Sequence, residues 1–125
     1  MRKGLQFLAI CIICVGCLSS CNRHNHNTSI SVNESGGIYT FTASFPEDKT
    51  RKIQRVINKS ISPGSLFKSA NDRTDITTIL QDKTTFYVKS SPGRIRIKIN
   101  RSGNSPASYN RIKELCEEVK EGLRN

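Results

Sequence analysis

The sequence predicts an α+β fold, a two-layer sandwich in which one antiparallel sheet of about five strands carries two helices on one face, in the order ββαβββα. Two patterns lead to this prediction. Five short segments alternate apolar with polar residues, which is typical of strands with one buried face, and two longer segments repeat apolar residues every three or four positions, which is typical of helices. Since each element has a single apolar face, placing both helices on one side of the sheet buries all these faces together.

The first two strands form a predicted hairpin. Ile30 and Val32 alternate with polar residues, Gly36 and Gly37 supply a turn, and residues 39, 41, 43 and 45 are apolar while those between them are Ser or Thr. Pro46 ends the second strand, because proline has no amide hydrogen to donate to a ladder.

The first helix is predicted from Glu47 to about Ser60. Glu47 and Asp48 would lie in its first turn, where the helix dipole favours anions. Its apolar stripe consists of Ile53, Val56, Ile57 and Ile61. A Ser-Pro-Gly-Ser turn at 62–65 ends it, and residues 65–73 are expected to form a loop.

Three strands and a second helix complete the predicted domain. Alternating segments at 76–80 and 85–89 flank a turn, and a second Ser-Pro-Gly turn precedes the clearest strand, in which Ile95, Ile97 and Ile99 alternate with charged residues. In the last helix, Ser105 is the predicted cap and residue 106 the first position, where proline is favoured, and the helix is expected to end at about Gly122.

The N-terminal segment has the pattern of an export signal. Arg2 and Lys3 precede an apolar run from residue 5 to 18, and the sequence Leu18-Ser19-Ser20-Cys21 follows. This sequence resembles the lipobox of bacterial lipoproteins. The resemblance implies cleavage between Ser20 and Cys21, diacylglyceryl transfer to the Cys21 thiol and acylation of its new amine.

The resulting organisation is a signal peptide at 1–20, a lipidated cysteine and polar tether at 21–28, and a single small domain at 29–125. The lipid on Cys21 would hold the protein on the cell membrane or the outer membrane, with its domain outside the cytoplasm. Several buried acyl chains give stable attachment, at about 0.8 kcal/mol per methylene.

Three other interpretations of this segment compete with it. Residues 4–22 carry no charge and would suit a transmembrane helix, although their apolar part is shorter than the roughly 20 residues that span a bilayer. Cys11, Cys14, Cys17 and Cys21 have the spacing of an iron–sulfur site, but apolar residues separate them and no proline follows. Ordinary secretory cleavage would require a small residue where Leu18 stands.

The residues of the mature chain argue against catalysis. Its only histidines, His24 and His26, fall in the tether, so the domain has no histidine for acid–base chemistry, and the pair lacks a third metal ligand. Cys116 lies on the apolar stripe of the last helix and is predicted to be a core residue. Asp72, Asp75 and Asp82 are expected in or near turns. We therefore predict no enzyme activity, no cofactor and no metal site.

A strongly basic stretch is the main candidate for binding. Residues 1–20 contain two basic residues and no acid, so the remaining 105 residues carry 18 Lys and Arg against 10 Asp and Glu, a net charge of +8. From residue 83 to 113 there are eight basic residues and no acid. If the isoleucines of the clearest strand face the helices, its cations line the open face of the sheet. The candidate anion-binding residues are Lys89, Arg94, Arg96, Lys98 and Arg101.

Two functions are consistent with these observations. The first is a membrane-anchored envelope lipoprotein whose small non-enzymatic domain has an interaction or structural role. The second is a basic binding module, such as an inhibitor or sensor, that recognises a lipid head group, an anionic envelope polymer or an acidic protein. Nucleic acid is not expected as a partner, because no aromatic residues interleave the basic strand. A solvated face that only prevents aggregation is the competing interpretation of the basic strand.

Overall fold

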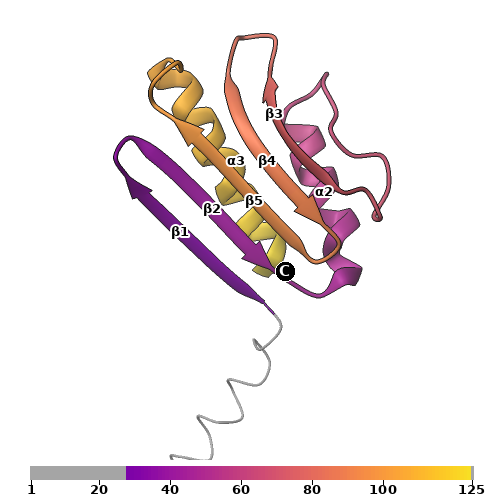
Figure 1. Cartoon of the computed structure of the whole chain (residues 1–125). Helices are drawn as coiled ribbons and strands as arrows, with labels where there is room; N and C mark the ends of the chain where they lie inside the picture. The colour runs from indigo at the N-terminus through magenta and orange to yellow at the C-terminus, as the bar shows by residue number, and fades with distance from the viewer. Residues whose placement is uncertain (1–27, 125) are drawn as a thin grey trace, which may run out of the picture.

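The computed structural model describes residues 28–124 and confirms the predicted α+β sandwich and its order of elements (Figure 1). One antiparallel sheet has the strand order β1-β2-β5-β4-β3, so β5 is central and β1 and β3 are the edges. Its strands are β1 (Ser29–Ser35), β2 (Ile38–Ser44), β3 (Thr74–Ile79), β4 (Thr85–Ser91) and β5 (Arg94–Asn100). The helices are α2 (Thr50–Ser60) and α3 (Pro106–Arg124), with a short 3-10 segment, η1 (Glu47–Lys49), before α2.

Both helices pack on one face of the sheet (Figure 1). The core forms where the alternating apolar residues of the three inner strands meet the apolar stripes of the helices. Ile95, Ile97 and Ile99 of β5 are buried, as are Phe41 of β2 and Val88 of β4. This burial fixes the direction of the neighbouring residues, because successive side chains of a strand point to opposite faces. The other face of the sheet is open.

The ends of the helices differ slightly from the prediction. Glu47 and Asp48 lie in η1 rather than in the first α-helical turn, because the amide of Lys49 donates to the carbonyl of Pro46 (2.9 Å) and closes a separate 3-10 turn. α3 continues two residues beyond Gly122. Its last turn is retained because the side chain of Leu123 still packs into the core.

The edge strands are less covered than their sequence patterns predicted. Val32 of β1 and Ile76 of β3 point to the helix side, since they pair with Phe41 and Val88, yet 46% and 44% of their surface is exposed. The helices cover the three inner strands, and the edges extend beyond them.

Three features predicted from the sequence lie outside the described residues. They are the signal peptide, the cleavage position between Ser20 and the lipidation site Cys21, and the two histidines of the tether. Between residues 28 and 124, no helix is both long enough and apolar enough to cross a membrane.

Candidate anion-binding site

Four of the five predicted anion-binding residues lie together on the open face of the sheet. Arg94, Arg96 and Lys98 alternate with the buried isoleucines of β5 and therefore point away from the helices. Lys89 of β4 is paired directly with Arg96 and shares its face. All four side chains belong to exposed residues.

The strand register arranges these cations in two cross-strand rows. In the first row, Arg94 lies between Ser44 of β2 and Ser91 of β4. In the second row, Arg96 lies between Thr42 and Lys89, and Asp75 of β3 follows beyond Lys89. The rows thus place hydroxyl groups beside guanidinium groups, a combination that can donate several hydrogen bonds to one anion.

A hollow of about 510 Å³ lies over these two rows. Cations from three segments line it, namely Arg73 before β3, Lys89 of β4, and Arg94 and Arg96 of β5. Asp75 is the only carboxylate among its lining residues. We call this feature the open-face hollow.

The cations of the open-face hollow have no carboxylate partners within residues 28–124, whereas ion pairs occur elsewhere in the domain. The five ion pairs there involve Arg101, Arg111, Lys113, Lys120 and Arg124. Lys89 and Arg96 are instead placed directly opposite one another, and like charges in this position destabilise a sheet. An anion bound between them would remove this repulsion.

Asp75, which was expected in or near a turn, is the second residue of strand β3 and lies close to the loop before it. Its carboxylate accepts a hydrogen bond from the hydroxyl of Tyr87 (2.7 Å). This bond raises the pKa of the Tyr87 hydroxyl above its ordinary value, because the bond favours the protonated phenol. Above that phenol, the Lys98 ammonium lies 5.9 Å from the ring centroid. The Asp75 carboxylate thus accepts its hydrogen bond from a neutral group, the Tyr87 hydroxyl, and forms no ion pair with Lys89.

Arg101 does not belong to the open face. It follows β5 at an odd position, like the buried isoleucines, and therefore turns to the helix side. There its guanidinium stacks on the ring of Tyr109 (4.4 Å to the centroid) and lies 3.8 Å from the carboxylate of Glu34. Glu34 also accepts hydrogen bonds from the Tyr109 hydroxyl and from the Lys113 ammonium, and these two bonds lower its pKa. Arg101 therefore helps to join β1 to α3.

Sequence reasoning missed several residues of the open-face hollow. Thr42 and Ser44 could have been placed on the open face, because they alternate with the apolar residues of β2. Their position beside Arg96 and Arg94 depends on the pairing of β2 with β5, two strands that are about fifty residues apart in the chain. Arg73 had no sequence signal, since it lies in the predicted loop just before β3.

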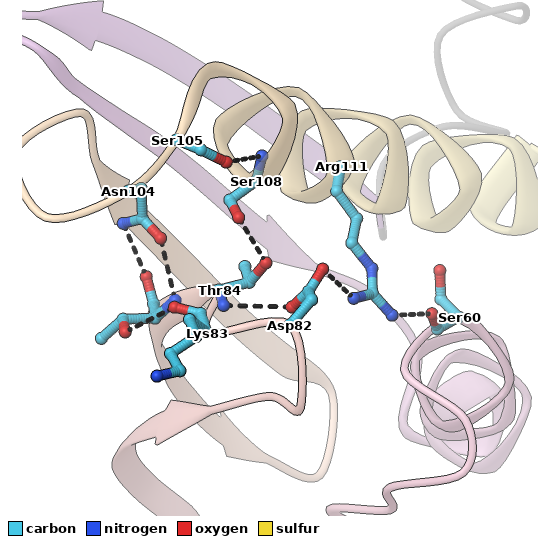
Figure 2. A network of polar contacts seen from close by, with 9 residues as sticks. Ser60, Asp82, Lys83, Thr84, Asn104, Ser105, Ser108 and Arg111 are labelled. Atoms are coloured by element: carbon cyan, nitrogen blue, oxygen red, sulfur yellow. Dashed lines mark hydrogen bonds and ion pairs between the residues drawn. The ribbon is translucent and has the colours of Figure 1, made fainter.

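Asp82 and Asp72 have structural roles. Asp82 lies in the β3–β4 turn, as predicted, and accepts bonds from the Thr84 amide (3.0 Å) and the Arg111 guanidinium (2.7 Å) (Figure 2). Arg111 also donates to the carbonyl of Ser60 at the end of α2, so this network ties the turn to both helices. Asp72 accepts the amides of Lys68 and Ser69 within the loop. Hydrogen bonds from the side chain and amide of Thr84, with a contribution from Arg111, hold the pKa of Asp82 below its ordinary value. The amides of Lys68 and Ser69 lower the pKa of Asp72 in the same way.

The same end of the sheet contains the predicted cap of α3. The hydroxyl of Ser105 accepts the amide of Ser108 (3.0 Å), and Pro106 is the first helical residue (Figure 2). Ser108 in turn accepts a bond from the buried hydroxyl of Thr84 (2.7 Å). Asn104 fixes the loop before the helix through both the amide and the carbonyl of Thr85. These contacts hold the end of the domain farthest from the open-face hollow.

Cys116 is completely buried in the core, and burial raises the pKa of its thiol to about 12. A thiol in this state is not a nucleophile near neutral pH. Within residues 28–124, no group of three or more His, Cys, Asp or Glu side chains is placed to hold a metal ion.

Comparisons of the chain with protein-family models, with curated proteins and with solved structures give no match.

Proposed function

We propose that this chain is a lipid-anchored, non-enzymatic protein of a bacterial cell envelope, and that its domain binds an anionic envelope component through the open-face hollow. The anchor is supported by the N-terminal sequence, in which a basic head, an apolar run and Leu18-Ser19-Ser20-Cys21 follow in the order of a lipoprotein signal. The binding function is supported by the arrangement of charges on the sheet.

The observation that carries the binding proposal is the juxtaposition of Lys89 and Arg96. They are direct cross-strand neighbours on an exposed face, with Arg73 and Arg94 lining the same hollow. A face that serves only for solubility gains from mixed charges, which attract one another. Four cations around one hollow instead create a positive potential that attracts anions, and the nearby hydroxyls add hydrogen-bond donors.

The anchor is tested by the intact mass of the protein isolated from bacterial membranes, compared with a Cys21→Ser variant. We expect a chain that begins at Cys21 and carries the added mass of acyl groups, and we expect this product to be missing from the variant. An unmodified full-length chain in the membrane fraction would contradict the anchor and would favour a transmembrane segment.

The binding function is tested with heparin as a model polyanion. The probe is a chain that begins at residue 22, compared with a variant that combines Lys89→Gln, Arg94→Gln and Arg96→Gln, which we call the open-face triple variant. We expect the variant to elute at clearly lower salt, while its urea midpoint stays the same or rises because the like-charge repulsion is removed. Elution of both proteins at the same salt concentration would refute binding through this face.

A further inference from the structure

The open-face hollow lies at the end of the sheet where the tether enters. Ser29, the first residue of β1, pairs with Ser44, and Ser44 pairs with Arg94. Arg94 and the start of the domain therefore occupy the same cross-strand row, two strand spacings or about 10 Å apart. Figure 1 shows the same arrangement, since the start of β1 and the β4–β5 turn are at one end of the molecule.

The length of the tether keeps this end close to the anchor. Cys21 and Thr28 are seven positions apart, with six residues between them. A chain of seven residues spans at most about 25 Å when fully extended, and about 15 Å on average when it behaves as a flexible coil. A lipid on Cys21 would therefore hold the hollow within a short distance of the bilayer surface, where the effective concentration of head groups is high.

The balance of charge at this end favours an anionic surface. Arg73, Lys89, Arg94 and Arg96 line the hollow, and Asp75 is the carboxylate among its lining residues. Glu47 lies against the β4–β5 turn with Asp48 next to it in η1, and Asp72 directly precedes Arg73. The opposite end of the open face is formed by neutral residues such as Ile38, Asn100 and Ile79. Lys98 lies one row away, and Lys83 lies in the β3–β4 turn beyond this end. The attraction to anions is therefore strongest beside the tether.

We infer that the anionic component is the phosphate-bearing surface of the membrane that holds the anchor, and that the open-face hollow docks on the head groups of anionic phospholipids. This inference rests on the function proposed above and narrows it to one partner. In the docked state the β4–β5 turn and the start of β1 face the bilayer, while the β3–β4 turn points away from it. Each cation near an anionic bilayer strengthens attachment about fivefold, which corresponds to about 1 kcal/mol.

Two lysines of the same hairpin provide an internal comparison. Lys89 lies near the end of β4 beside the hollow, and Lys83 lies in the turn that precedes β4; both residues are exposed. They are six positions apart, which corresponds to about 20 Å along an extended chain. This is twice the distance over which salt screens a charge, about 10 Å. A docked bilayer should therefore protect the first lysine and leave the second accessible.

The experiment uses the protein isolated from bacterial membranes and reconstituted into vesicles. Lysines are acetylated with an amine-reactive ester, and the rate at each site is measured by mass spectrometry on vesicles of phosphatidylcholine alone and of phosphatidylcholine with phosphatidylglycerol. We expect acetylation of Lys89 to slow at least fivefold on the anionic vesicles, and acetylation of Lys83 to stay unchanged. The double variant Arg94→Gln, Arg96→Gln should lose the protection of Lys89.

A third sample, the protein in detergent with heparin, distinguishes anion binding by the hollow from docking of the hollow on phospholipid head groups. Protection of Lys89 by heparin but not by anionic vesicles would overturn docking on phospholipids and leave anion binding intact. Absence of protection in both samples would overturn the docking and the proposed function together. Equal protection of Lys83 and Lys89 on anionic vesicles would also overturn the docking, because it would show attraction without this orientation.

Discussion

Asp75 weakens the attraction of the open-face hollow for anions, because it is the only carboxylate that lines the hollow within residues 28–124. Substitution Asp75→Asn removes one negative charge and keeps an oxygen that accepts the hydrogen bond of Tyr87. A unit charge about 8 Å from a bound anion is worth about 2 kcal/mol near a protein surface, and screening by salt over about 10 Å reduces this to roughly 1 kcal/mol or less. We expect heparin affinity to rise about twofold to fivefold. The affinity is measured by titration at fixed ionic strength.

The matched control for this prediction is Glu114→Gln. Glu114 is exposed on α3 and lies in the helix layer, so its substitution changes net charge equally but far from the hollow. An equal gain of affinity in both variants would mean that net charge, and not the hollow, governs binding.

Glu34 makes the stability of the domain sensitive to acid. Its hydrogen bonds from Tyr109 and Lys113 hold its pKa below the ordinary value of 4.5 in the folded state. A carboxyl group with a lowered folded pKa stabilises the fold above the unfolded pKa, and this contribution is lost as pH falls through the folded pKa. Glu34→Gln should therefore lower the melting temperature at pH 7, and the difference from wild type should shrink as the pH falls from the unfolded pKa toward the folded pKa.

The melting temperature of both proteins between pH 7 and pH 3 checks this prediction. Glu121→Gln serves as the control, because Glu121 forms only an exposed ion pair within α3 and such pairs contribute little. Parallel pH curves for wild type and Glu34→Gln would show that this carboxylate does not link stability to pH.

At the scale of elements, the β4–β5 turn positions Arg94. Gly93 has a φ of +80°, and an added Cβ atom would lie 2.9 Å from the carbonyl oxygen of Phe45. Gly103 has nearly the same φ, +83°, with no atom within 4 Å of an added Cβ. The two glycines thus share the left-handed conformation and differ in whether a side chain has room.

This difference predicts unequal costs for the same substitution. The left-handed conformation costs alanine about 1–2 kcal/mol, so Gly103→Ala should lower the free energy of unfolding by about that amount. Gly93→Ala should lower it by about 2–4 kcal/mol, because the close contact adds a strain of about 1–2 kcal/mol. Urea unfolding of both variants measures the difference, and equal losses would contradict the steric argument.

The elements also show where sequence reasoning works and where it stops. Alternation within β5 was enough to place Arg94, Arg96 and Lys98 on one face, because side-chain direction along a strand is a local property. The same rule applied to Arg101 would have placed it on the helix side. The exposure of Val32 and Ile76 was not predictable, since a local pattern shows which face a residue occupies but not how far the helices extend over it.

At the scale of the whole molecule, the fold class was predictable because each element has one apolar face and a two-layer sandwich buries them all. The hollow was only partly predictable. It depends on the pairing of β2 with β5 and of β3 with β4, and residues far apart in sequence can pair in several ways that bury the same apolar faces. The position of Arg73 beside Lys89 follows from this pairing alone.

A second group of cations makes it possible to test whether binding depends on where the positive charges lie or only on the net charge. Lys52, Arg55 and Lys59 are exposed on the outer surface of α2 and, like the open-face cations, form no ion pair within the described part of the chain. They lie on a helix in the other layer and line none of the open-face hollow. Changing all three to Gln lowers the net charge by the same three units as the open-face triple variant.

If binding depends on the hollow, the two triple variants must behave differently. We expect the α2 triple variant to keep heparin affinity within about threefold of wild type, because its cations act only through the long-range field, which salt screens over about 10 Å. The open-face triple variant should lose about a hundredfold, or roughly 1 kcal/mol for each cation in contact with the polyanion. Titration at low and physiological salt measures both, and the gap should persist at the higher salt. Equal losses of heparin affinity in the two variants would show that net charge governs binding and that the open face is only a solvated surface.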